Sequence, residues 1–413
     1  MSAAAEFDVI ISGGGLVGAS LACALASLPL RVALVEAVPL SSATQPSFDD
    51  RAIALSRTSR VILGGIGAWE AVAAVATSIR RIHVSERGRF GSAVISAEEQ
   101  GVDALGHVVA SRDLGAALWG RVGALPGIEV FCPGTLHSPV VGQAAITVEL
   151  DAGQGGGQSA GQLRGRLLVV ADGARSGLRQ ALGIGATERS YGQTAVVGNV
   201  AIAGVSGSCT AYERFSVEGP LALLPFRDGR HVFVLARPPA AAEAALAMDE
   251  AAFLRLLQES FGRRIGEFVQ LGRRAAYPLS LLQARELGAP RAVVIGNAAQ
   301  GLHPVAGQGY NLGLRDVATL AEVVAEALRT GADPGGAATL ARHAQLRRRD
   351  RRNVIAFTDG LIRLFGLAAP GMGAARGAGL LLFDMLPGAK RALARHTMGM
   401  AGPMTRLARG LPL

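Results

Sequence analysis

Glycines near the N-terminus have the spacing of a dinucleotide-binding turn. The segment DVIISGGGLVGAS runs from an apolar strand predicted over residues 9–11 into a helix of small residues. The turn between them contains Gly13, Gly15 and Gly18. Glycines allow the tight reversal and the close approach of backbone to pyrophosphate, and the free N–H groups at the start of the helix favour an anion. Glu36 ends a second predicted strand, residues 31–35, where such folds place a carboxylate that accepts ribose hydroxyl groups. Alone, this pattern fits FAD, a nicotinamide dinucleotide or chance.

A second segment, far along the chain, adds features that suit FAD. An apolar strand predicted over residues 292–295 leads into a loop rich in Pro and Gly, whose residues 303–309 we call the flavin loop. The predicted cofactor-binding residues here are Gly296, Asn297, Pro304, Gly307, Gly309 and Asn311. Polar groups at the strand end can reach a sugar-like chain, and the loop can lie flat against a ring. The helix beginning near Asn311 presents N–H groups to the edge of a reduced flavin, which gains negative charge. NAD has neither a ribityl chain nor such a ring.

A third strand-turn-helix pattern lies between these two. The apolar strand predicted over residues 167–170 ends in Asp172 and Gly173, which we add to the predicted cofactor-binding residues. Three such patterns in this order favour one FAD site over unrelated turns. Because no second glycine fingerprint occurs in mid-chain, we expect NAD(P)H to bind transiently, without a Rossmann domain of its own.

Nearly the whole chain resembles a known enzyme family. The run LHPVAGQGYNLGLRD is its most specific part, and GGGLVG, DDRAIALS, ADGARS and GPLALLP add to it. These motifs are similar to those of flavin-dependent aromatic hydroxylases of the para-hydroxybenzoate hydroxylase type, and more narrowly to ubiquinone-biosynthesis hydroxylases. GNAAQ and the ending LARHTMGMAGPMTRLARGLPL look most like the 2-polyprenyl-6-methoxyphenol hydroxylase branch.

The resemblance implies an FAD-dependent monooxygenase that hydroxylates the ring of a prenylated phenol, through a flavin C4a-hydroperoxide formed from NAD(P)H and O2. It also implies that Arg51 lies over the FAD and that Arg112 contacts an FAD phosphate. A surface salt bridge is the alternative for Arg51, and an ordinary amphipathic helix is the alternative for Arg112. Asn297 departs from the family, since many members carry Asp there. Asn still accepts one ribityl hydroxyl bond and donates another, so FAD binding is still expected.

The sequence offers candidate catalytic residues but fixes none. His303 either contacts the flavin or substrate, or orders the loop through a hydrogen bond. The resemblance places the region of Tyr212, Glu213 and Arg214 beside the substrate, where a base would draw the phenol proton and raise the nucleophilicity of the ring. Our candidates are His303, Pro304, Tyr212 and Arg214.

The predicted fold class is α/β, with a discontinuous Rossmann-like FAD-binding domain. Short alternating segments over 80–109 and 195–237 indicate an antiparallel sheet in a second, substrate domain, and a C-terminal helical segment follows. Apolar residues at helical spacing predict a helix over residues 111–122. We assign residues 1–78, 105–182 and 286–360 to the FAD-binding domain, 79–104 and 183–285 to the substrate domain, and 361–413 to the C-terminal segment.

Composition argues against nucleic-acid binding. The chain has 413 residues, 50% of them hydrophobic, which is enough for two packed domains. Its net charge of +9 comes almost entirely from arginine, while aromatic residues make up 5% and are not interleaved with the basic runs. The chain therefore offers no stacking platform for nucleic acid. The basic ending suggests instead peripheral association with a membrane or with a biosynthetic complex, where the segment from residue 361 onward either packs across both domains or touches the membrane or partner.

Other sequence features indicate a cytoplasmic protein, with peripheral attachment to the inner membrane as an alternative. Cys23, Cys132 and Cys209 have no metal or redox spacing, and we expect them to be buried and inert. We expect no metal site, no secretory signal and no membrane span, which would need ~20 apolar residues.

Two other functions are compatible with these motifs. One is a different FAD oxidoreductase of the same fold, such as a polyprenyl reductase. The other is a non-catalytic subunit that holds FAD within a biosynthetic complex. Turnover separates them, because the subunit binds flavin without reacting, and the reductase leaves the phenol unhydroxylated.

Overall fold

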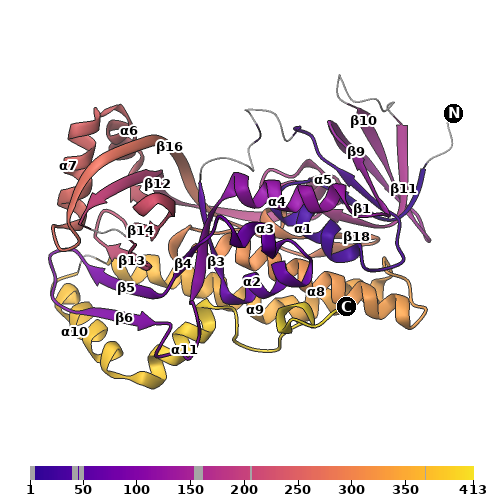
Figure 1. Cartoon of the computed structure of the whole chain (residues 1–413). Coiled ribbons are helices and arrows are strands. Elements are labelled where there is room, and N and C mark those ends of the chain that lie inside the picture. Colours follow the sequence, from indigo (N-terminus) through magenta and orange to yellow (C-terminus); the bar gives the residue numbers. More distant parts are fainter. Residues whose placement is uncertain (1–4, 40–44, 46–50, 153–160, 205–206, 368) are drawn as a thin grey trace.

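Two large sheets and a helical C-terminal segment organise the molecule (Figure 1). The structure is a computed structural model, and it describes residues 5–39, 45, 51–152, 161–204, 207–367 and 369–413. The sequence GQGGGQSAGQ at residues 153–162 predicts a surface loop of low complexity, and its residues 153–160 lie outside the described ranges.

The first sheet has the order β17-β18-β11-β1-β2-β8, with β10 and β9 added beside β11. Its parallel strands are β1 (Ala5–Ser12), β2 (Val32–Val35), β8 (Ile128–Phe131), β11 (Gly161–Val170) and β18 (Ala292–Val294). Antiparallel strands β9 (Gly134–Val141), β10 (Ile146–Ala152) and β17 (Gly288–Ala289) complete it. The central strands are apolar runs because both faces of a parallel sheet are buried.

Alternate residues of these strands enter two different cores. Val9 and Ile11 pack with helices α1 (Leu16–Leu25), α4 (Ser111–Gly123) and α8 (Gln308–Arg329). Ile10 points to the opposite face, where the core includes β9, β10 and α5 (Gly177–Ala181). A small sheet of β3 (Ala52–Ser56), β7 (Gly106–Ala110) and β4 (Thr77–Ile79) adjoins this layer, with α2 (Arg57–Gly65) and α3 (Trp69–Ala73).

The second sheet has the order β19-β16-β12-β15-β14-β13-β5-β6. Its strands are β5 (Arg81–Glu86), β6 (Ser92–Ser96), β12 (Ala186–Ala203), β13 (Thr210–Phe215), β14 (Leu221–Pro225), β15 (Arg230–Arg237), β16 (Glu267–Ala284) and β19 (Gln300–Gly301). Helices α6 (Pro239–Ala247) and α7 (Glu250–Phe261) pack on one face. The predicted antiparallel arrangement holds except that β13 and β5 run parallel. The β5–β6 hairpin joins from a distant segment, so no short turn imposes an antiparallel direction.

The remaining elements include the long helix α9 (Ala337–Gly366), α10 (Met372–Met385), α11 (Pro387–Thr397) and the short turns η1 (Arg227–Gly229), η2 (Gly296–Ala298), η3 (Val305–Gly307) and η4 (Leu407–Arg409). The two large sheets draw their strands from the segments assigned to the two domains, apart from β19. The domain boundaries themselves stay a proposal.

The C-terminal segment packs across both domains, which is one of the two possibilities that the sequence left open. Arg376 of α10 forms a buried ion pair with Glu86 of β5, and Phe365 stacks on Phe215 with ring centroids 3.8 Å apart. Further on, Leu407 and Ala408 of η4 enter the core of the first sheet. Figure 1 shows α10 and α11 beneath β5 and β6 and the C-terminus beside α8.

The cysteines correct one expectation. Cys23 is buried, and burial raises the pKa of its thiol to about 12, but Cys132 and Cys209 are partly exposed. All three are free thiols. In the described part of the chain, we find no group of three or more His, Cys, Asp or Glu residues able to hold a metal ion.

Candidate functional site

The three sequence patterns meet at one edge of the first sheet. Strands β1, β11 and β18 are neighbours and parallel, so the turns that follow them lie together. Gly13 has φ +96°, and a Cβ there would lie 2.6 Å from the carbonyl oxygen of Ala171, just after β11. Gly296, after β18, has φ +59°, and its Cβ would lie 3.0 Å from Val17 of α1. Ligands of open α/β sheets bind outside this carboxyl edge, at such turns.

The glycine turn between β1 and α1, which we call the fingerprint turn, forms hydrogen bonds with side chains of two other segments. The N–H of Gly14 donates to Glu36 Oε2 at 2.6 Å, and Trp119 Nε1 of α4 donates to the Gly14 carbonyl at 2.8 Å. Helix α1 starts at Leu16, and its N-cap, Gly15, offers no capping side chain. The first N–H groups of α1 therefore suit an anion.

Glu36 lies where the sequence predicted, at the end of β2. Its side chain is buried, and Oε1 also accepts from the Val38 N–H at 2.9 Å and from Gln45 Nε2 at 3.3 Å. A carboxylate has about four acceptor sites. Three protein donors thus leave capacity for a ribose hydroxyl.

Replacement of Glu36 tests that role. Glu36→Ala should weaken FAD by ~1–3 kcal/mol, the range for losing a hydrogen bond to a charged group. Glu36→Gln, which keeps one acceptor oxygen, should fall between Ala and wild type. The measurement is a fluorescence titration of apoprotein with FAD, with Glu129→Ala on β8 as the exposed control. Wild-type affinity in Glu36→Ala would remove the assignment.

The flavin loop leads into α8 through a left-handed turn. Ala306 has φ +57°, and Gly307 has φ +59° and is the N-cap of α8. A Cβ on Gly307 would lie 2.8 Å from that of Ala54 on β3, whereas at Gly309 it would meet open space. Helix α8 begins at Gln308, three residues before the predicted start. Its first N–H groups again lack a side-chain cap from the N-cap residue.

The side chain of Asn311 is fully engaged within the protein. Its Oδ1 accepts from the Ser56 N–H at 2.8 Å and the Ser59 hydroxyl at 2.7 Å. Its Nδ2 donates to the carbonyls of Ala54 and Gly307. The Asn311 amide therefore has no free donor or acceptor position left for the predicted contact to FAD. Asn311 instead ties the flavin loop to β3 and α2.

The hydrogen bonds of His303 are those of a loop-ordering residue, the second of its two predicted roles. Its Nδ1 accepts from the Val305 N–H at 3.1 Å, and its Nε2 lies 3.4 Å from Gln193 Oε1. Burial lowers the pKa of His303 to about 4, so the ring is neutral. Pro304 is exposed, and its carbonyl accepts from the Gly307 N–H.

Of the other predicted cofactor residues, Asp172 and Gly173 follow β11 and Asn297 follows β18, so these three lie at the same edge. Asp172 and Asn297 are exposed there, and Gly173 has φ +95°. The guanidinium of Arg51 lies 4.7 Å from the ring centroid of Tyr277 on β16. Arg112, in the first turn of α4, is half-exposed and lies 3.6 Å from Asp113.

Two buried arginines, Arg347 and Arg179, stabilise the site but were not identified from the sequence. Arg347 of α9 pairs with Asp316 of α8, Nε to Oδ1 2.6 Å, and Asp316 Oδ2 accepts from the Gly296 N–H at 3.1 Å and Gln300 Nε2 at 2.7 Å. Arg179 of α5 donates to the carbonyls of Ala174 and Ala298, both at 3.0 Å. The Arg347 pair and Arg179 thus fix the turn after β18.

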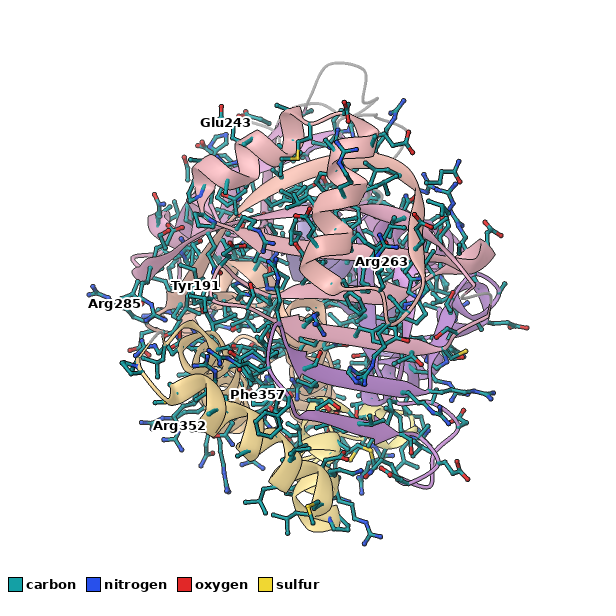
Figure 2. The ribbon with its side chains drawn as sticks, turned by 90° about the vertical axis from the view of Figure 1, so that its left-hand side faces the viewer. Tyr191, Glu243, Arg263, Arg285, Arg352 and Phe357 are labelled. Carbon is teal, nitrogen blue, oxygen red and sulfur yellow. The ribbon has the colours of Figure 1, made fainter. Side chains whose placement is uncertain are left out.

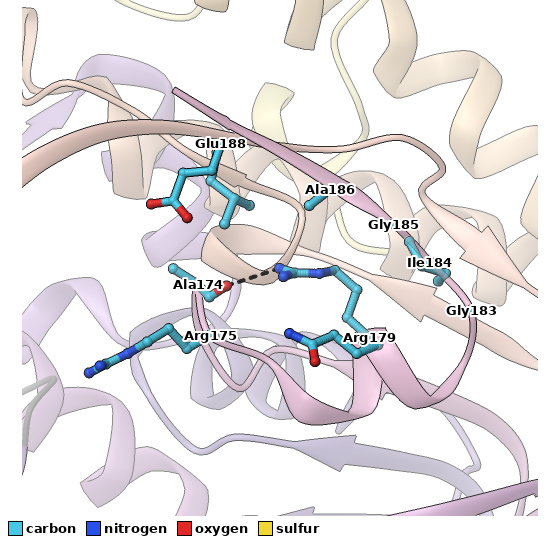
Figure 3. Close-up of a pocket in the computed structure, with 10 residues that line it drawn as sticks. Ala174, Arg175, Arg179, Gly183, Ile184, Gly185, Ala186 and Glu188 are labelled. Atoms are coloured by element: carbon cyan, nitrogen blue, oxygen red, sulfur yellow. Dashed lines mark hydrogen bonds between the residues drawn. The ribbon is translucent and has the colours of Figure 1, made fainter. Parts of the chain in front are cut away.

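Arg179 also lines an open cavity of about 590 Å³ beside this turn (Figure 3). Figure 3 shows Arg179 reaching across to Ala174, while Arg175 points away from it.

The candidate catalytic residues on β13, Tyr212 and Arg214, face away from the flavin loop. The ring of Tyr212 packs edge-on against Phe261 of α7 at 5.4 Å, and the Arg214 guanidinium lies 5.5 Å from the same ring. The structure therefore does not bring Tyr212 or Arg214 to the flavin loop. Strand geometry turns Glu213, between them, toward the opposite face.

The site fits FAD on its own geometry. Close backbone packing at Gly13 and Gly296 leaves no room for side chains, and helices α1 and α8 both begin with glycine N-caps that leave their first N–H groups without a side-chain partner. Glu36 retains acceptor capacity for the ribose. These features match the donors and acceptors of pyrophosphate, sugar and flavin ring.

Comparison with known proteins confirms the resemblance. A family model described as FAD binding domain matches residues 6–354. Ubiquinone hydroxylase UbiL of Rhodospirillum rubrum is 37% identical over 410 residues, which cover 98% of this chain and 93% of that protein. The 3-demethoxyubiquinol 3-hydroxylase of Escherichia coli is 29% identical, with 95% of this chain and 98% of that protein covered.

A solved structure shows the same fold. The p-nitrophenol 4-monooxygenase PnpA from Pseudomonas putida superposes with a TM-score of 0.79 at 19% identity, over 97% of this chain and 100% of that one. With the relatives above, this match confirms the predicted fold class. The chain belongs to the family of FAD-dependent monooxygenases of ubiquinone biosynthesis.

Proposed function

We propose that this protein hydroxylates the aromatic ring of a polyprenylated phenol. The observation that carries the proposal is an apolar face of the second sheet, opposite α6 and α7, which we call the substrate face. Its partly exposed apolar residues are Val84, Val197, Ala222, Leu224 and Val234. Such a face suits a prenylated ring better than a polar metabolite, and the relatives' names as ubiquinone hydroxylases support the same substrate class.

The residues proposed to hold FAD surround the carboxyl edge of the first sheet. They are Gly13, Gly15, Gly18, Glu36, Arg51, Arg112, Asp172, Gly173, Gly296, Asn297, Pro304, Gly307 and Gly309, with Asn311 acting through its loop. Bound FAD, with NAD(P)H and O2, supplies the electrons and the oxygen atom for ring hydroxylation.

The protein's own contribution is placement, charge stabilisation and exclusion of water. The flavin loop sets the ring position through the bonds of His303 and Asn311. The start of α8 offers N–H groups to the edge of the flavin that gains negative charge. The apolar substrate face keeps water from the reacting carbon.

A reconstitution assay tests this function. FAD-loaded protein is mixed with NADPH and a short-chain prenylated phenol under ¹⁸O₂, and the product is analysed by mass spectrometry. One labelled oxygen on the ring supports the proposal. NADPH oxidation without labelled phenol supports a reductase, and bound FAD without any turnover supports a non-catalytic subunit. Quinone intermediates in a deletion strain provide the matching test in cells.

We further propose that the protein meets its substrate at a membrane surface. None of the helices in the described ranges is long and apolar enough to span a bilayer. Helix α10 and the residue after it expose apolar side chains at Leu381, Leu382, Met385 and Leu386, the third of them 77% exposed. Arg391 and Arg395 of α11 are exposed next along the chain. An apolar strip beside basic residues suits an anionic lipid surface.

Point variants test membrane binding without removing the packed tail. Leu382→Asp combined with Met385→Asp should weaken sedimentation with anionic vesicles at least about tenfold, because the apolar insertion is lost and the two new carboxylates repel the anionic lipid. Wild-type binding should weaken with added salt, since each basic residue contributes ~1 kcal/mol that salt screens. Val140→Asp combined with Val141→Asp, at another exposed apolar site on β9, is the control. Equal sedimentation of all three proteins would count against this surface.

A further inference from the structure

Glu213 is the ionisable residue in an otherwise apolar row that crosses the substrate face. Residues that face each other on paired strands share one side of a sheet. The pairing register aligns Glu213 with Val84 on β5 and with Ala222 on β14. The row then continues through Val234 on β15 and Val197 on β12.

The same-face neighbours of Glu213 along β13 pack against the surroundings of the flavin loop. Phe215 shares a buried cluster with Val305, which lies inside the loop. Ala211 shares another cluster with Ala54, the residue against which Gly307 packs. Since successive same-face positions on a strand are close, Glu213 lies between Phe215, which packs on the loop, and Ala211, which packs on Ala54 beside it.

The carboxyl of Glu213 lacks a partner within the described part of the chain. Among the described residues, we find no hydrogen bond or ion pair to it, and the residue as a whole is only partly exposed. Burial raises the pKa of Glu213 to about 8. That value is much closer to the ~10 of a phenol than the usual ~4.3 of a glutamate is. Proton exchange with a phenol is favoured by such a match.

We propose that Glu213 accepts the phenol proton of the substrate. The inference rests on the proposed function, and it names the residue that prepares the ring. The O–H bond of the phenol breaks, its proton passes to a Glu213 carboxylate oxygen, and the electron pair stays on the phenolate, which makes the ring more nucleophilic. After oxygen addition, the ring carbon loses its hydrogen as a proton to solvent, and Glu213 returns its own proton to the phenolate oxygen. Glu213 is neither oxidised nor reduced, because the electrons come from NAD(P)H and O2.

The test compares Glu213→Gln with Glu243→Gln on two substrates at pH 8. Gln keeps the shape of Glu213 but accepts no proton. Glu243 is an exposed glutamate on α6, on the other side of the sheet (Figure 2). One substrate is an ordinary prenylated phenol. The other is a ring-fluorinated analogue that is already ionised at this pH. Titration of the flavin absorbance without NADPH measures binding of each substrate separately from turnover.

Glu213→Gln should lower hydroxylation of the ordinary phenol about 100-fold, within the range for loss of a general base. It should lower hydroxylation of the ionised analogue less than about fivefold, with FAD content and substrate binding near wild type. Glu243→Gln should change neither substrate's rate. Equal loss with both substrates, or loss of binding, overturns the inference by making Glu213 a residue that only shapes the site. No loss with either also overturns it. Wild type that hydroxylates neither substrate contradicts the proposed function itself.

Discussion

Arg347→Ala should destabilise the folded protein by ~3–5 kcal/mol, the range for breaking a buried ion pair from one side. Arg347 and Asp316 are both almost fully buried, and Arg347 also binds Asp350 and the Leu312 carbonyl. Without the guanidinium, Asp316 remains as an uncompensated buried charge. The loss should appear as a lower midpoint in urea unfolding followed by far-ultraviolet circular dichroism.

Two matched variants sharpen this expectation. Arg348→Ala removes an exposed arginine from the next position of the same helix, and it should stay within about 0.5 kcal/mol of wild type. Arg347→Met combined with Asp316→Asn removes both charges, so it should recover part of the lost stability. A midpoint for Arg347→Ala equal to that of Arg348→Ala would show that the buried pair contributes little.

Gly18→Ala should reduce FAD affinity at least about 100-fold, which corresponds to ~3 kcal/mol. A Cβ at residue 18 would lie 1.8 Å from the carbonyl oxygen of Gly13, so the fingerprint turn must open before the methyl group fits. Overpacking against backbone at this distance reaches or exceeds the usual cost of ~1–3 kcal/mol. The readout is the ratio of flavin to protein after gel filtration, followed by titration with FAD.

Gly120→Ala is the control for a glycine in a helix. Residue 120 lies on the exposed side of α4, where a Cβ would meet nothing within 4 Å. This variant should keep full FAD and gain ~0.5–1 kcal/mol in stability, the usual difference between Gly and Ala in a helix. If Gly18→Ala bound FAD as tightly as Gly120→Ala, the close packing of this turn would have no role in binding.

The sequence predicted the backbone of the site well, because glycine at turns and apolar runs in parallel strands encode backbone geometry directly. Gly13 and Gly296 both adopt positive φ, as the turn after a strand required. Arg347 was missed because the run LRRRDRRN, residues 346–353, resembles a solvated helix face. Helical periodicity could have identified Arg347. It lies four residues after His343 and seven before Val354, so the three share one face of α9, and this face is buried.

The side chains of β13 were harder to predict for a different reason. Side chains alternate faces along a strand, so an error of one position exchanges the two faces. Tyr212 and Arg214 were favoured over Glu213 for their chemistry. The residue types in the strand do not show which of its two faces points toward the flavin loop. The burial of Phe215 against the flavin loop shows which face this is. The sequence could not show it, because this contact joins residues far apart in the chain.

The ion pair between Glu86 and Arg376 has a consequence for synthesis on the ribosome. The two residues lie 290 positions apart, so β5 waits for most of the chain to be translated before its buried carboxylate meets a partner. For the first part of that interval, until β13 is translated, the β5–β6 hairpin also presents an unpaired strand edge. Nascent chains stalled before residue 376 should therefore be prone to aggregation and dependent on chaperones, although the first sheet is already largely made.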